Sequence, residues 1–140
     1  MSIETKSSYL KPLPYPSAES RPFWEAARRH RLMVQKCGRC GRFRFPPAAR
    51  CPHCLAAEHE WTEVSGRGRV FSFVTYHRLY HEGWDGEIPY VVAVIELEEG
   101  PRLLSTVTGV APNEVRCDMP VRVVFDDVTE DVTLPKFAPA

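Results

Sequence analysis

The sequence predicts a mainly β protein with a short N-terminal helix, a zinc ribbon and a small barrel of five strands. Two observations predict it: a pair of Cys-x-x-Cys motifs before residue 55, and a series of alternating apolar and polar segments after residue 61. We therefore expect an arm and helix over 1–31, a zinc ribbon over 32–61 and a barrel over 62–140.

The N-terminal region predicts an arm followed by one helix. Residues 1–19 are rich in Pro, Ser and Tyr, which favours an extended arm that lies either on the protein's own surface or on a partner. A helix is expected near 21–31, because Ser20 is a suitable N-cap and Pro22 is tolerated in a first turn. The expected helix ends on basic residues, which suits the negative end of its dipole.

The cysteines predict a structural metal centre. Cys37 and Cys40 form one knuckle and Cys51 and Cys54 form a second, so that one zinc ion can draw four thiolates into a tetrahedron. Four thiolates fill the coordination shell and leave no position for water or substrate. His53 could compete as a ligand, but we expect it to be exposed. Disulfides are disfavoured, since residues 1–30 contain no recognisable signal peptide.

The second half of the chain predicts the barrel. Five short strands are too few for a typical sandwich, and the five-stranded OB-fold fits them best. Pro112 and Pro120 limit the connection over 111–120 to a turn or a single helical turn. The expected strands are Gly68–Arg78, Tyr90–Glu98, Arg102–Val110, Val121–Val128 and Val132–Phe137.

The charge distribution is uneven although the net charge is zero. Residues 1–54 carry eleven Lys and Arg against three Asp and Glu, whereas residues 55–140 carry seven against fifteen. This split indicates a local anion site or a docking surface and argues against coating of nucleic acid by the whole chain. No apolar run approaches the ~20 residues of a membrane span. The cysteine content and the lack of a signal peptide predict a cytoplasmic protein.

In combination, these motifs resemble the domain of unknown function 35 family, in which a rubredoxin-like zinc ribbon precedes an OB-fold. The resemblance runs from about Ser20 to Pro139, and the loop over 80–88 departs from it. The residues that carry it are Phe23–Ala26, Leu32–Gly41, Phe45–Pro47, Cys51–Cys54, Gly68–Ser72, Pro89–Val92, Glu99–Arg102 and Met119–Val121.

The resemblance implies a function without catalysis by this chain. Members of the family are accessory subunits of thiolase-like enzymes, namely thiolases, acyl-CoA synthases and aldolases, so the catalytic residues are expected in a partner. A CoA thioester is then shared with that partner. The candidate contacts to CoA or to the partner are Trp24, Arg28, Arg29 and Arg31, because guanidinium groups bind phosphates and lie near aromatic residues here. The alternative for these arginines is a solvated helix end.

Two other functions are weighed against this one. A single-stranded nucleic-acid-binding module would use the OB-fold, but its groove should be net positive and the barrel half is acidic. An enzyme would use the loop cluster of His77, His81, Glu82 and Asp85, yet no nucleophile motif or phosphate loop accompanies it. The aromatic residues Tyr76, Tyr80, Trp84 and Tyr90 are further candidates for a partner surface.

Overall fold

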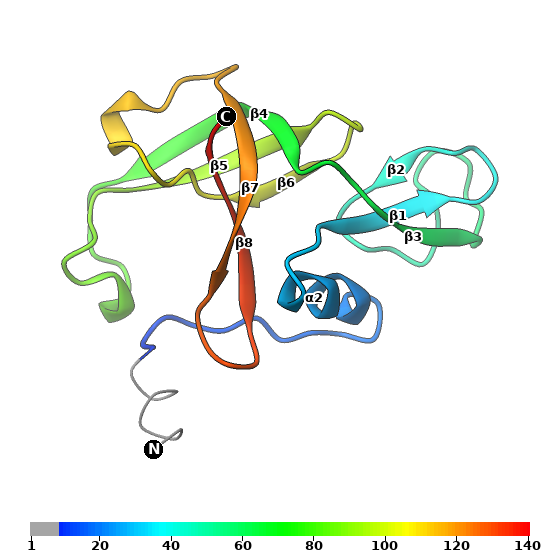
Figure 1. Cartoon of the computed structure of the whole chain (residues 1–140), viewed down its shortest axis with the longest axis horizontal. Coiled ribbons are helices and arrows are strands. Elements are labelled where there is room, and N and C mark those ends of the chain that lie inside the picture. Colours follow the sequence, from blue (N-terminus) through cyan, green and yellow to red (C-terminus); the bar gives the residue numbers. More distant parts are fainter. Residues whose placement is uncertain (1–8) are drawn as a thin grey trace.

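The computed structural model describes residues 9–140 and shows a small ribbon sheet beside a curled five-stranded sheet (Figure 1). One helix, α2 (Arg21–Arg28), packs against the first ribbon strand and against the last strand of the larger sheet. No helix in the described part of the chain is long and apolar enough to cross a membrane. The predicted order of helix, ribbon and curled sheet is confirmed.

Helix α2 is shorter than predicted. Pro22 occupies its first turn, and Phe23, Ala26 and Ala27 form its buried side, as the sequence indicated. Ser20 is at the N-cap position, but its hydroxyl accepts from the backbone N–H of Ser17 and does not cap the helix. The helix ends at Arg28 because the chain turns at His30, whose φ is 59°.

The ribbon is a three-stranded antiparallel sheet. Its strands are β1 (Met33–Cys37), β2 (Phe43–Arg44) and β3 (His59–Glu63), in the order β2-β1-β3. β1 and β2 flank the first knuckle, and β3 adds a third strand. Because β1 ends at Cys37, which pairs with His59 of β3, the sheet fixes the position of the first knuckle.

The larger sheet contains the five predicted strands, all antiparallel, in the order β6-β5-β4-β7-β8. The segment just after the edge strand β6 approaches the other edge strand, β8, through a parallel bridge between Val107 and Phe137, so the sheet curls into a half-barrel consistent with an OB-fold. The connection before β7 contains one turn of 3-10 helix, η2 (Pro112–Glu114), as predicted. The strands are β4 (Arg67–Tyr76), β5 (Tyr90–Leu97), β6 (Arg102–Ser105), β7 (Pro120–Asp127) and β8 (Thr133–Pro139).

The helix, the ribbon and the barrel share one apolar core. Phe23 and Val34 belong to the same buried cluster as Ile95, Val121 and Phe137 of the barrel. The helix and the ribbon are therefore anchored on the barrel by apolar burial. The division at residues 31 and 61 stays a prediction about the chain's organisation.

The described part of the arm lies on the protein's own surface, which is one of the two alternatives expected for it. Lys11 Nζ is 2.7 Å from Glu87 Oε1 and lies over the ring of Trp84. These contacts hold the arm against the loop that connects β4 with β5. This loop contains the 3-10 helix η1 (Glu82–Trp84). Residues 1–8 of the predicted arm lie outside the described residues.

Candidate metal centre and surrounding surfaces

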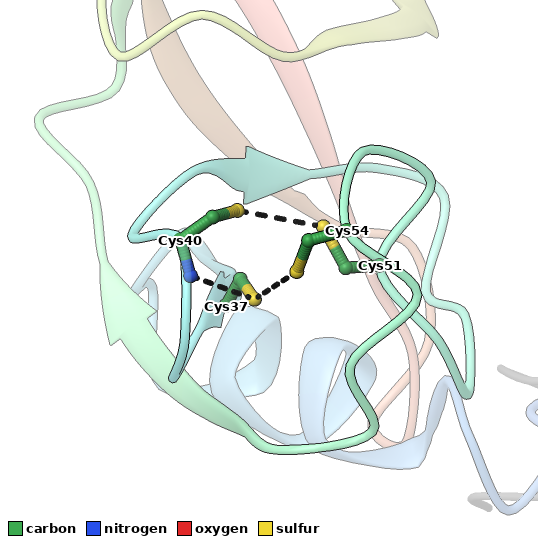
Figure 2. A group of neighbouring side chains, drawn as sticks. All are labelled: Cys37, Cys40, Cys51 and Cys54. Carbon is green, nitrogen blue, oxygen red and sulfur yellow. Dashed lines mark hydrogen bonds between the residues drawn. The ribbon is translucent and has the colours of Figure 1, made fainter.

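The two knuckles bring four thiols to one point between their loops (Figure 2). The Sγ atoms of Cys37, Cys40, Cys51 and Cys54 all lie within 4.8 Å of one another. The distance from Cys37 Sγ to Cys54 Sγ is 3.5 Å, and that from Cys40 Sγ to Cys51 Sγ is 3.6 Å. A disulfide would need sulfurs about 2.05 Å apart, so these cysteines do not form disulfides with one another.

The backbone of each knuckle is shaped to hold a thiolate. The N–H groups of Cys40 and Arg39 donate to Cys37 Sγ and lower the pKa of that thiol to about 6. Around Cys51, the N–H groups of Cys54 and His53 likewise lower the thiol pKa against the effect of burial. Gly41 follows the first knuckle with a φ of 76°, a conformation that glycine adopts without strain.

The four side chains fit a zinc ion. Four sulfurs at about 2.3 Å from a tetrahedral zinc lie about 3.8 Å from one another, which falls between the observed distances of 3.5 and 3.6 Å and the upper limit of 4.8 Å for the whole set. The thiolate character favoured by the N–H donors is what zinc ligation requires. When bound, the ion would cross-link the two knuckle loops and supply no open coordination position for chemistry.

Two other side chains that could bind a metal, His53 and Cys117, are exposed. His53 is exposed in the second knuckle, and it is absent from the cluster of metal-ligating side chains found in the described part of the chain. Cys117 is an exposed thiol in the connection before β7.

The predicted CoA or partner contacts lie on α2 and just beyond its end. Arg28 is exposed at the end of α2, whereas Arg29 and Arg31 lie beyond it. Arg31 is paired with Glu63, with 2.9 Å between Nη2 and Oε1, so its charge is already partly neutralised. The expectation that all three arginines form the basic last turn of a helix is wrong, because the turn at His30 ends the helix first.

Trp24 lines an apolar hollow where the helix, the ribbon and the barrel meet. The hollow has a volume of about 310 Å³, and Trp24 stacks edge-on against Phe23 there. Leu104, which is 70% exposed, lies at its rim. The other lining residues are Phe45, Leu103, Ser105, Thr106, Leu134, Pro135 and Lys136.

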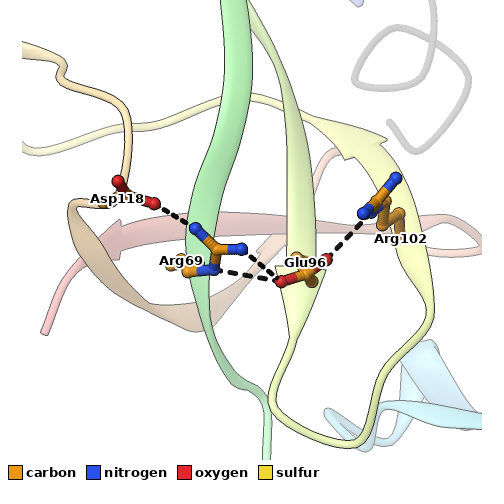
Figure 3. A network of polar contacts seen from close by, with 4 residues as sticks. All are labelled: Arg69, Glu96, Arg102 and Asp118. Carbon is orange, nitrogen blue, oxygen red and sulfur yellow. Dashed lines mark hydrogen bonds and ion pairs between the residues drawn. The ribbon is translucent and has the colours of Figure 1, made fainter.

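Two arginines on the surface of the barrel, Arg69 and Arg102, form ion pairs with carboxylates (Figure 3). Arg69 of β4 and Arg102 of β6 both donate to Glu96 of β5, at 2.7 and 2.9 Å, and Arg69 also pairs with Asp118. These side chains give Glu96 a lowered pKa, mainly through the hydrogen bond from Arg69. Guanidinium groups committed to carboxylates are poorly placed to bind phosphates, which weakens the nucleic-acid alternative.

The aromatic candidates do lie together. Tyr90 stacks on both Tyr76 and Trp84, with ring centroids 5.1 and 5.4 Å apart, and Tyr80 contacts Tyr76 edge-on. The loop residues His77, His81, Glu82 and Asp85 are exposed, and the His81 ring nitrogen accepts the backbone N–H of Gly83. The sequence did not predict the buried charged atoms of Arg44 and Glu99. Arg44 is buried although charged, and it lies between the half-buried Phe43 and Phe45, so no alternation of buried and exposed residues indicates its burial.

Family models agree with this architecture. The rubredoxin-like zinc ribbon domain of ChsH2 matches residues 24–60, and the C-terminal OB-fold domain of ChsH2 matches residues 61–126. Together they cover the helix, the ribbon and most of the barrel.

Three curated relatives extend the comparison. A probable enoyl-CoA hydratase alpha subunit of Thermomonospora curvata is 37% identical over 98% of this chain, which spans only 42% of that relative. A DUF35 domain-containing scaffold protein of Methanocaldococcus jannaschii is 35% identical, over 74% of this chain and 73% of its own length. The benzoylsuccinyl-CoA thiolase subunit BbsA of Thauera aromatica is 31% identical, over 71% of this chain and 67% of its own length.

Among solved structures, the Ltp2-ChsH2(DUF35) aldolase contains a similar chain. The TM-score is 0.83 at 36% identity, and the match covers 91% of this chain and 98% of that one. With four thiols arranged for zinc, a ribbon and an OB-fold in the same order, and relatives of similar length, this chain belongs to the family of the domain of unknown function 35.

Proposed function

We propose that this chain is a non-catalytic accessory subunit that binds a thiolase-like enzyme and supports its reaction on an acyl-CoA. The observation that carries the proposal is the likeness to the DUF35 chain of an aldolase complex, which the chain matches over nearly its whole length. The thiolase subunit and the scaffold protein among its relatives have names that describe the same kind of role.

The metal centre would serve this role by fixing shape. We assign Cys37, Cys40, Cys51 and Cys54 as the ligands of one structural zinc, in agreement with the match to a zinc ribbon. A closed four-thiolate site holds the knuckle loops rigid and adds no reactive water. Such thiolates persist in a reducing compartment, which is consistent with a location in the cytoplasm.

The apolar hollow around Trp24 is our candidate for the main partner contact. Interfaces favour aromatic residues at their centres and depend on a few well-packed anchors. Trp24 is half-buried beside the strongly exposed Leu104, so a partner side chain can complete the hollow without rearranging the core. The neighbouring exposed Arg28 and Arg29 would then lie at the rim and act on the rate of encounter.

Coexpression tests the proposal. The chain should form a hetero-oligomer with a thiolase-like enzyme encoded in the same genome, measured by size-exclusion chromatography with light scattering. The complex should turn over acyl-CoA faster than the enzyme alone, whereas the isolated chain should have no turnover. Thioester cleavage by the pure chain that is lost in His77→Ala or His81→Ala would contradict the non-catalytic assignment.

Variants then locate the contact. Trp24→Ala should weaken the complex by more than the triple variant Arg28→Ala, Arg29→Ala, Arg31→Ala, because buried aromatic anchors outweigh rim charges. The triple variant should mainly reduce the salt sensitivity of association, since exposed charges act over about 8 Å at physiological salt. Tight binding to a single-stranded oligonucleotide without assembly with any thiolase-like enzyme would favour the nucleic-acid alternative.

A further inference from the structure

The described part of the N-terminal arm carries a group of exposed apolar side chains close together in the sequence. Leu10 is 62% exposed, Leu13 is 42% exposed and Tyr15 is 97% exposed. We call residues 10–16 the proline strap; in Figure 1 it belongs to the blue segment that leads to α2. Apolar side chains that are exposed as a group indicate an interaction site, whereas single ones are common on any surface.

The covalent chain restricts the proline strap to one backbone conformation. Proline occupies positions 12, 14 and 16, which fixes φ at about −65° at each of them. Lys11, Leu13 and Tyr15 each precede a proline, and a residue in that position is confined to extended conformations. Residues 11–16 therefore favour a polyproline II helix. Such a helix has no internal hydrogen bonds, and among residues 9–140 the strap forms no backbone–backbone hydrogen bond.

The burial of the strap has the period of this helix. From Leu10 to Pro16, the partly buried residues are Lys11 and Pro14, which are three positions apart. A polyproline II helix has three residues per turn, so one of its three rows of side chains faces the protein and two face solvent. The outward rows consist of Leu10, Leu13 and Pro16 on one side and Pro12 and Tyr15 on the other.

Both ends of the strap are fixed to the rest of the protein or to the turn before α2. Lys11 Nζ lies 2.7 Å from Glu87 Oε1 and over the ring of Trp84. Beyond the other end, the N–H of Ser17 donates to Ser20 Oγ at 2.8 Å and the N–H of Ser20 donates to Ser17 Oγ at 3.1 Å. A segment held in one place and one conformation loses little further entropy when a partner binds it.

These features define the chemistry of the binding partner. Polyproline II segments bind in grooves lined by aromatic side chains, which accept the exposed prolines and apolar residues. The carbonyl groups of the strap can accept hydrogen bonds from Trp N–H or Tyr O–H groups of such a groove. A phosphate backbone is an unsuitable partner, because the strap's one cation, Lys11, is already paired with Glu87.

The strap adjoins the hollow that we assign to the partner contact. A cavity of about 310 Å³ between the arm and the barrel is lined by Lys11 and Pro12 of the strap. A single partner surface can cover both this cavity and the hollow around Trp24, because four barrel residues line both. These four are Ser105, Thr106, Leu134 and Lys136.

We propose that the proline strap is a polyproline II ligand that docks in an aromatic-lined groove of the partner enzyme, with Tyr15 as its anchor. The inference rests on the proposed function for the identity of the partner. It adds a second contact beside the Trp24 hollow, one whose recognition depends on backbone conformation as well as on side chains.

Binding of the zinc-loaded full chain to the thiolase-like enzyme, measured by biolayer interferometry, tests the proposal. Tyr15→Ala should weaken the complex about tenfold or more, because it removes an interface anchor. Tyr15→Phe, which keeps the ring, should bind almost as tightly as the native chain. Leu55→Ala, a change at a similarly exposed apolar residue of the second knuckle, is the matched control and should leave the affinity unchanged.

Replacement of the three prolines of the strap by alanine tests the role of conformation. This triple variant keeps Leu10, Leu13 and Tyr15 but gives the free strap more conformational freedom to lose on binding. The complex should therefore weaken about tenfold or more. Zinc content and circular dichroism confirm that each variant is folded.

Tyrosine-directed chemical modification reports on the contact itself. Tyr15 should be modified readily in the free chain and protected in the complex. Full modification of Tyr15 in the complex, or native affinity in both Tyr15→Ala and the triple proline variant, would overturn the inference and leave the proposed function standing. Failure of the native chain to bind any thiolase-like enzyme would overturn both. Self-association of the free chain that is lost in Tyr15→Ala would overturn the assignment to an enzyme partner, since the strap would then bind a second copy.

Discussion

The ribbon and the barrel are stabilised in different ways. Around the knuckles, the buried cluster consists only of Cys37, Cys51 and Ala56, with Cys54 packed against it. The barrel instead shares in a large cluster of buried Val, Ile, Leu and Phe side chains, including Ile95 and Phe137, which are fully buried. The knuckle half of the ribbon therefore depends on its metal, whereas the barrel depends on apolar burial.

The two sources of stability differ in size. Fully burying one Leu, Ile or Phe side chain is worth about 1.5–3 kcal/mol, and the knuckle cluster contains none of these residues. A thiolate zinc site contributes an apparent 10–16 kcal/mol in small peptides, which is enough to hold loops that have no core of their own. The apolar hollow that we propose for the partner lies where these two regions meet.

Removal of the metal should have the largest effect. Cys37→Ser, or treatment with a strong chelator, should unfold the knuckle loops, since binding energies of order 10 kcal/mol are lost. The barrel should persist because its core lies outside the knuckles. Hydrogen exchange should show lost protection over residues 37–58 and retained protection in β4 and β5. Cys117→Ser, a change at an exposed thiol, is the control. Global unfolding of the zinc-free chain would contradict the claim that the barrel is stable without the metal.

Phe137→Ala should have the opposite effect: it should weaken the barrel and leave the zinc site intact. Phe137 is completely buried in β8 and belongs to the main core, so truncation should lower the free energy of unfolding by about 3–5 kcal/mol. Chemical denaturation measures this loss. The variant should still bind one zinc per chain, because the four thiols belong to loops outside that core. If Phe137→Ala lost its zinc while its free energy of unfolding stayed unchanged, the expectation that zinc binding is independent of this core would be wrong.

The sequence predicted the elements whose signal is local. Cys-x-x-Cys spacing placed the metal centre, and alternation in Val91–Leu97 placed a strand whose inward residues are all buried. It did not predict the end of α2, because the turn at His30 depends on tertiary contacts: that ring stacks on Phe125 and bonds to Asp127 of the barrel.

The same limit applies to the candidate contacts. Arg28, Arg29 and Arg31 were grouped because they are close in sequence, but Arg31 pairs with Glu63, which is distant in the chain. Arg44 and Glu99 are 55 positions apart in the numbering, and only the packing of the ribbon beside the barrel turn places them in one cavity. Long-range pairs of this kind have no periodic signal in a single sequence.

Gly66 lies on the short connection between the ribbon and the barrel and offers a smaller, more local test. Its φ is +79°, and a Cβ atom added there would lie 2.4 Å from Val123 Cγ1. Gly66→Ala should destabilise the protein by about 1–2 kcal/mol from the left-handed backbone alone, with a further cost for the clash. Gly86→Ala is the matched control, since Gly86 has a φ of +82° and no neighbour within 4 Å. Equal melting temperatures for the two variants would exclude a role for the contact with Val123.

The smallest expected effect concerns the polar contact that joins the turn after α2 to the barrel. His30 Nε2 lies 2.9 Å from Asp127 Oδ1, and the Thr133 hydroxyl donates to the same carboxylate. The Thr133 hydrogen bond and, next, His30 hold the pKa of Asp127 below its ordinary value. Asp127 then binds fewer protons in the folded state than in the unfolded state, so its contribution to stability is complete above pH ~4 and is lost as the pH falls below that value. Asp127→Asn should therefore flatten this part of the acid unfolding curve, measured by circular dichroism, while leaving the zinc content unchanged. An acid limb identical to that of the native sequence would mean that the contact contributes nothing to holding the helix end on the barrel.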